Sequence, residues 1–111
     1  MRKMKHLLFL TIVVSLLASC SKDEVGYKTV SYQQTYCADP WRYDNGDDIT
    51  QARYVGNYLD SLGLFHTSVL VKVERPGDLC LACTCKSGKV IYVVTKDEES
   101  VLQQYRAIGF N

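Results

Sequence analysis

Four cysteines constrain the folded part of this 111-residue chain more than any other feature. Cys80, Cys83 and Cys85 lie within six residues, and Cys37 lies far earlier in the chain. Small exported domains commonly use disulfides to compensate for a thin hydrophobic core. A Cys83–Cys85 ring would be very tight, so two of the three pairings remain: Cys37–Cys85 with Cys80–Cys83, or Cys37–Cys83 with Cys80–Cys85. Both predict a covalent link between Cys37 and the later cysteine segment.

The same four side chains allow a second interpretation, a metal site. Four thiolates suit Zn²⁺ or Cu⁺. The usual zinc pattern has two separated CxxC pairs, whereas this chain has three clustered cysteines and one distant one. A thioredoxin-like redox site is disfavoured, because Cys80-x-x-Cys83 does not begin a helix that would lower a thiolate pKa. Zinc or copper binding by Cys37, Cys80, Cys83 and Cys85 therefore stands as the alternative to two disulfides.

The N-terminus has the pattern of a secretory signal. Residues 1–6 carry three positive charges and no acid, and residues 7–18 are almost wholly apolar. A basic start followed by about a dozen apolar residues is typical of a signal peptide. A membrane-spanning helix needs about 20 apolar residues, which this run does not reach. The sequence therefore predicts export of the chain.

The end of the apolar run, Leu17-Ala18-Ser19-Cys20, resembles the lipobox of bacterial lipoproteins. The resemblance implies cleavage after Ser19 and acylation of Cys20, by palmitate-like chains, on its sulfur and its new amino group. Several acyl chains give stable membrane anchoring, whereas one gives marginal binding. The next segment, Ser21-Lys22-Asp23-Glu24, is similar to the surface-export signal of lipoproteins in one large phylum of Gram-negative bacteria. Together these resemblances imply an outer-membrane lipoprotein that faces the cell exterior.

Removal of residues 1–19 leaves 92 residues with 10 basic and 12 acidic side chains, a net charge of −2. This balance argues against a nucleic-acid partner, since such proteins usually carry a basic excess on one face. At 47% hydrophobic and 23% charged residues, the composition is that of a globular chain. We expect a signal peptide at 1–19, a lipidated tether at 20–26 and a single domain at 27–111.

Hydrophobic periodicity predicts two helices and three or four strands in that domain. The expected strands cover 27–36 (Val30, Tyr32 and Tyr36 inward), 65–74, an irregular 79–85, and a central 89–95 after a tight turn at Ser87-Gly88. The expected helices cover 48–62, with a capping box at Asp48 and Gln51, and a segment capped by Asp97 and ending at Ile108. Gly63-Leu64 and Gly109-Phe110 are the expected helix endings, each with a glycine in the left-handed conformation and an apolar residue after it. This order, β-α-β-(β)-β-α, predicts an α+β fold in which two helices cover one face of a small, mostly antiparallel sheet, similar to a split βαβ unit.

The first and second strands should end at the same edge of the sheet, which brings loop 38–48 beside loop 76–88. Trp41, Arg42 and Tyr43 in the first loop are the candidate binding residues, because aromatic and arginine side chains are enriched at interfaces. His66 lacks a recognisable nucleophile partner, and no catalytic residue or cofactor is expected. We therefore predict a non-enzymatic binding or structural lipoprotein with an extracellular protein or glycan as partner. The alternative is a zinc- or copper-binding envelope protein.

Overall fold

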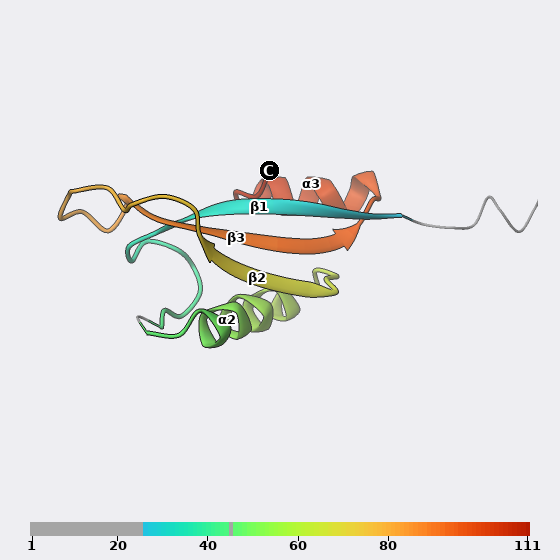
Figure 1. The fold of residues 1–111 in the computed structure, drawn as a ribbon. Coiled ribbons are helices and arrows are strands. Elements are labelled where there is room, and N and C mark those ends of the chain that lie inside the picture. The colour runs from blue at the N-terminus through green and yellow to red at the C-terminus, as the bar shows by residue number, and fades with distance from the viewer. Residues whose placement is uncertain (1–25, 45) are drawn as a thin grey trace, which may run out of the picture.

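The computed structural model describes residues 26–44 and 46–111. In chain order they form β1 (Tyr27–Thr35), α2 (Asp48–Ser61), β2 (Ser68–Val73), β3 (Lys86–Lys96) and α3 (Glu99–Ala107) (Figure 1). β3 lies between β1 and β2 and is antiparallel to both. β1 and β2 are therefore parallel to each other with a strand between them, which confirms the predicted α+β fold and its split βαβ arrangement.

The predictions for the N-terminus fall outside this part of the chain. The signal peptide at 1–19, the lipobox ending at Cys20, the segment 21–24 and nearly all of the tether at 20–26 precede the first described residue. Across 26–44 and 46–111, no helix combines the length and the apolar character that a membrane span requires.

A single hydrophobic core lies on one face of the sheet. Val30, Val93 and Val69 are aligned across the three strands, and the next inward row is Tyr32, Ile91 and Val71. Both helices place apolar side chains against these rows, so both cover the same face, as predicted. The buried apolar members of the core are Val30, Trp41, Val55, Leu59, Leu64, Val71, Ile91, Val93, Leu102, Tyr105 and Phe110.

Two glycines end the helices as the sequence predicts. Gly63 (φ 70°) and Gly109 (φ 102°) adopt the left-handed conformation that residues with a side chain rarely reach. After each glycine an apolar residue packs back into the core: Leu64 donates its backbone N–H to Leu59, and Phe110 donates its N–H to Tyr105. The pairs Gly63-Leu64 and Gly109-Phe110 therefore predict where the chain reverses after α2 and α3.

The residues that cap the helix N-termini differ from the expected ones by one position, although α2 begins at Asp48 as predicted. Asp47, and not Asp48, caps α2, because its side chain accepts the Ile49 N–H at 3.0 Å. Gln51 takes no part in a capping box and is fully buried instead. Its amide donates to the Arg42 carbonyl at 2.8 Å and accepts from the Asp44 N–H at 2.7 Å, which ties loop 38–48 to α2. α3 is preceded by Glu98 rather than Asp97.

Three predictions about the strands are wrong. Residues 79–85 form bends and turns, so the optional fourth strand does not exist, and β3 already begins at Lys86. Ser87-Gly88 is no hairpin turn: Gly88 lies inside β3, and its carbonyl accepts from the N–H groups of Glu74 and Arg75. In β1 the register shifts between Gln33 and Thr35, so Thr35 is buried and Tyr36, expected inside, is exposed.

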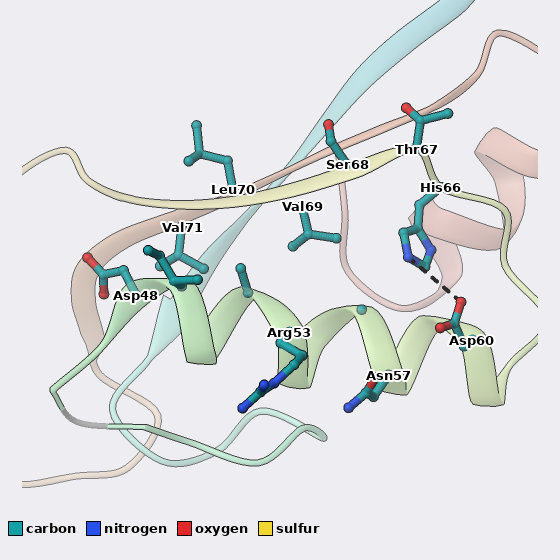
Figure 2. A pocket seen from close by; sticks show the side chains of 13 residues that line it. Asp48, Arg53, Asn57, Asp60, His66, Thr67, Ser68, Val69, Leu70 and Val71 are labelled. Atoms are coloured by element: carbon teal, nitrogen blue, oxygen red, sulfur yellow. Dashed lines mark ion pairs between the residues drawn. The ribbon is translucent and has the colours of Figure 1, made fainter.

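The two outer strands have different edges. The outward backbone of β1 is paired with the C-terminus, since Ser31 and Asn111 exchange two hydrogen bonds of 2.8 and 2.9 Å. Along β2, Val69 and Val71 point toward α2 while Ser68 and Leu70 point away from it (Figure 2). Within 26–44 and 46–111, no further strand pairs with the outer edge of β2.

Candidate functional site

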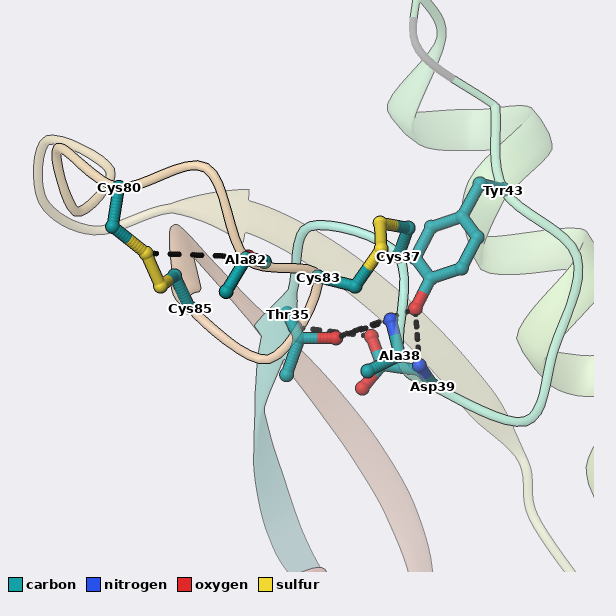
Figure 3. Close-up of a disulfide and its surroundings, with 9 residues drawn as sticks. All are labelled: Thr35, Cys37, Ala38, Asp39, Tyr43, Cys80, Ala82, Cys83 and Cys85. Atoms are coloured by element: carbon teal, nitrogen blue, oxygen red, sulfur yellow. Dashed lines mark hydrogen bonds between the residues drawn. A yellow bond between two sulfur atoms is a disulfide. The ribbon is translucent and has the colours of Figure 1, made fainter.

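Two disulfides shape the end of the sheet where β1 stops (Figure 3). Cys37 pairs with Cys83, with their Cα atoms 4.5 Å apart, and Cys80 pairs with Cys85, with Cα atoms 6.4 Å apart. This is one of the two pairings that the sequence left open. Metal binding would need these sulfurs as free thiolates, so the pairing does not favour the zinc or copper alternative. Within the described ranges, no three His, Cys, Asp or Glu side chains are grouped as a metal would require.

Hydrogen bonds reinforce the covalent link that Cys37–Cys83 makes between the end of β1 and the cysteine loop, defined here as residues 74–85. The N–H groups of Tyr36 and Cys37 donate to the carbonyls of Cys85 (3.0 Å) and Cys83 (3.2 Å). The Tyr36 hydroxyl donates to the Asp78 carbonyl at 2.7 Å. Asp78 in turn exchanges bonds with the backbone of Lys86. The base of the loop is thus held from both sides.

The tip of the cysteine loop exposes two large apolar side chains. Leu79 and Leu81 are fully exposed, and Tyr36 is partly exposed beside them. Together with Asp78 and Cys80 they line a shallow hollow of about 360 Å³. Scattered exposed leucines are common, but two at the tip of a doubly cross-linked loop form a local apolar patch that water does not stabilise.

Loop 38–48 is ordered around the carboxylate of Asp39, which is buried. It accepts from the Tyr32 hydroxyl at 2.6 Å and from the Thr35 N–H at 3.0 Å. The Asp39 N–H donates to the Tyr43 hydroxyl, and the Thr35 hydroxyl accepts from the Ala38 N–H at 2.9 Å. Burial, followed by the hydrogen bond to Asp39, raises the pKa of Tyr32, and burial raises the pKa of Tyr43. Both hydroxyls therefore stay neutral at physiological pH and fix the loop, the Tyr32 hydroxyl as a donor to the Asp39 carboxylate and the Tyr43 hydroxyl as an acceptor from the Asp39 N–H.

The candidate binding residues of loop 38–48 divide into two groups. Trp41 is only 4% exposed and packs edge-on against Tyr32 (4.9 Å between ring centroids) and Tyr58 (5.8 Å). It is a core residue, so the prediction that its ring forms a contact surface is wrong, because the Gln51 hydrogen bonds fold the loop inward over α2. Arg42 is exposed, with its guanidinium 5.2 Å from the Tyr54 ring centroid, and Tyr43 is half-buried. Their binding role stays a prediction.

A second concavity, of about 450 Å³, lies between α2 and β2 (Figure 2). His66 lies at one end of it, with Nε2 3.7 Å from Asp60 and Nδ1 3.3 Å from the Leu64 carbonyl. Gly56 faces the imidazole, and a Cβ at this position would lie 3.6 Å from Nε2. The contacts with Asp60 and the Leu64 carbonyl position the imidazole at this end of the concavity.

Sequence reasoning missed Leu79, Leu81 and the α2–β2 groove. The leucines alternate with Cys80, and alternation predicts a strand, yet the short Cys80–Cys85 ring forces a turn. The close spacing of the cysteines was the available signal, because a five-position cross-link cannot span an extended strand. The groove depends on how α2 sits beside an unpaired strand edge, which only the assembled fold defines.

No protein-family model, curated protein or solved structure matches this chain.

Proposed function

We propose that this chain is a lipid-anchored outer-membrane protein, facing the cell exterior, that binds a partner through the apolar tip of its cysteine loop. The exposure of Leu79 and Leu81 on a doubly cross-linked loop carries the binding part of the proposal. The lipobox-like Leu17-Ala18-Ser19-Cys20 supports the anchor. The two disulfides are consistent with export to an oxidising compartment.

The energetics of the loop favour recognition. Burying a leucine side chain contributes about 1.5–3 kcal/mol, so covering both leucines would supply a substantial part of a binding free energy. The disulfides restrict the loop before it meets a partner, which reduces the conformational entropy lost on binding. Two aliphatic side chains fit an apolar protein surface better than a glycan, which offers mainly hydroxyl groups. Between the two expected partner classes, we therefore favour an extracellular protein.

The position of the loop agrees with this role. The chain enters the domain at Tyr27, which pairs with Lys96 at one end of the sheet, and the cysteine loop lies at the other end (Figure 1). The nine residues of β1 separate the two ends by about 30 Å. In the proposed topology, an anchor at Cys20 holds the Tyr27 end near the membrane and leaves the loop tip available to a partner on the far side.

Site-specific photo-crosslinking in intact cells tests the binding surface. A photoreactive amino acid replaces Leu79, and the same residue at the exposed Gln104 of α3 serves as the matched control. We expect a discrete cross-linked product from position 79 that is lost on adding Leu81→Ser, and none from position 104. The absence of a product at 79, or the same product from both positions, would contradict binding through the loop tip.

Fractionation tests the anchor independently. The wild-type protein should sediment with outer membranes, and Cys20→Ala should not. Protease added to intact cells should degrade the wild-type protein. Protection of the protein from protease would refute surface exposure while leaving the anchor intact.

A further inference from the structure

The groove between α2 and the outer edge of β2 is a second concave surface, distinct from the cysteine loop. Its floor is formed by small and branched apolar residues, and its α2 wall carries longer polar ones (Figure 2). Gly56 gives the groove its depth, because a Cβ there would already lie 3.9 Å from the Val69 side chain. The residues that line the groove include Ala52, Arg53, Gly56, Val69 and Val71.

The β2 edge offers unpaired backbone groups along this groove. Glu74 donates its N–H to Gly88 of β3, in the same register that pairs Lys72 with Val90 and Leu70 with Tyr92. Backbone groups alternate in direction along a strand, so those of Val69, Val71 and Val73 point away from β3. The Ser31–Asn111 bonds at the opposite edge of the sheet lead to the same assignment. They fix which residues of β1 face β3, and the strand register then fixes which residues of β3 and β2 face each other. An edge of this kind is a template for another strand, and β-strand addition is a common mode of peptide recognition.

The charges of the groove favour an acidic occupant. Both of its carboxylates already lie beside basic side chains: Asp48 is 2.6 Å from Lys89 Nζ, and Asp60 is 3.7 Å from the His66 imidazole. Arg53 lies on the exposed face of α2 and has no carboxylate within 4 Å among residues 26–44 and 46–111. A carboxylate on the incoming strand would give Arg53 an ionic partner, because arginine binds carboxylates through two parallel hydrogen bonds.

We propose that an extended acidic segment of a partner protein adds to β2 as a fourth strand of the sheet. Its backbone bonds to Val69, Val71 and Val73, its alternate side chains enter the groove above Gly56, and one of its carboxylates pairs with Arg53. A second copy of this chain fits less well. Two-fold pairing of β2 with itself would set the two α2 helices antiparallel and bring Arg53 near the Arg53 of the other copy, where like charges repel.

The probe is a random decapeptide library displayed on phage and selected on the full mature chain carrying Cys20→Ser, with both disulfides formed. The enriched sequences are then synthesised as free peptides and titrated against ¹⁵N-labelled protein. We expect enrichment in Asp and Glu, and amide shifts centred on β2 and Arg53. Arg53→Glu should reverse the selection toward peptides rich in Lys and Arg.

Val73→Pro tests the backbone pairing, because it removes one outward N–H from an exposed position. It should weaken peptide binding about tenfold, the equivalent of one hydrogen bond, whereas Val73→Ala should leave affinity unchanged. If Val73→Pro fails to fold, the charge reversal at Arg53, an exposed residue, decides the question alone.

Three results would overturn the proposal: selected peptides without an acidic preference, amide shifts confined to the cysteine loop, or unchanged preference in Arg53→Glu. A dimer in sedimentation that Val73→Pro abolishes would also overturn it, in favour of a second copy at the β2 edge. Because the photo-crosslinking experiment reads out Leu79 and Leu81, its failure is distinguishable from a failure of strand addition at β2.

Discussion

Removing the two disulfides separately should produce unequal losses of stability. In the chain-entropy model, a cross-link stabilises a protein by reducing the entropy of the unfolded chain, and the effect grows with the logarithm of the loop length. Cys37 and Cys83 are 46 positions apart, and Cys80 and Cys85 are 5 apart. The model then assigns about 4 kcal/mol to the first disulfide and about 2 kcal/mol to the second.

The comparison is clean because Cys37, Cys80 and Cys83 are exposed and Cys85 is only half-buried. Serine in their place creates no cavity in the core, so the difference between the two double variants reports the cross-link. A domain of this size has a total stability of about 4–13 kcal/mol. We therefore expect Cys37→Ser with Cys83→Ser to leave a marginally folded chain, and Cys80→Ser with Cys85→Ser to leave a folded one.

Urea unfolding, followed by the fluorescence of Trp41, measures both losses. Trp41 is the only tryptophan and is 4% exposed, so its emission moves to longer wavelength when the core opens. Intact mass after thiol alkylation verifies that the remaining disulfide has formed in each variant. Equal losses, or a larger loss for the Cys80–Cys85 pair, would refute the argument from loop length.

Three further predictions concern the core and its caps. Gly109→Ala should cost about 2 kcal/mol and Gly63→Ala about 1 kcal/mol in urea unfolding, because both have positive φ but only at Gly109 would the new Cβ lie 2.8 Å from the Tyr32 ring. Burial and Asp39 raise the pKa of Tyr32, so this phenol ionises in the unfolded chain at a lower pH than in the folded one. The urea concentration at the unfolding midpoint should therefore stay constant below about pH 10 and decrease above it, and the decrease should be less steep in Tyr32→Phe. Hydrogen bonds from Thr50 and the Ile49 N–H lower the pKa of Asp47, so the ionised carboxylate stabilises the folded state. The wild type should lose this stabilisation as the pH falls below about 4, and Asp47→Ala should not show this pH-dependent loss in the same titration.

The regular elements of the fold could be predicted because their signals are local. β3 carries apolar side chains on both faces, which predicts a central strand, and β3 does lie between β1 and β2. Gly63 and Gly109 marked the helix ends because their φ values exclude most other residues. The link between Cys37 and the later cysteines followed from the parallel direction of the first two strands, which places both loops at one end of the sheet.

The candidate site was harder to predict because its features depend on long-range contacts. Trp41 has the sequence context of a surface aromatic in a polar loop, yet Gln51 draws that loop over α2 through hydrogen bonds with Arg42 and Asp44, nine and seven positions earlier. The register shift after Gln33 exchanges the sides of Thr35 and Tyr36, and no single residue announces it. That exchange places the Tyr36 hydroxyl on Asp78 and so helps to hold the cysteine loop.

The two disulfides thus have different roles at this end of the domain. Cys37–Cys83 closes a long loop and ties the end of β1 to the cysteine loop, so its effect is mainly on stability. Cys80–Cys85 adds little stability by the same reasoning, but its short ring turns the chain between two exposed leucines. If the leucine tip is the binding surface, the chain that lacks only Cys80–Cys85 should remain folded and yet lose the cross-link from position 79. A retained cross-link would mean that the backbone bonds of Tyr36 and Asp78 suffice to present the tip, and that the second disulfide has no part in recognition.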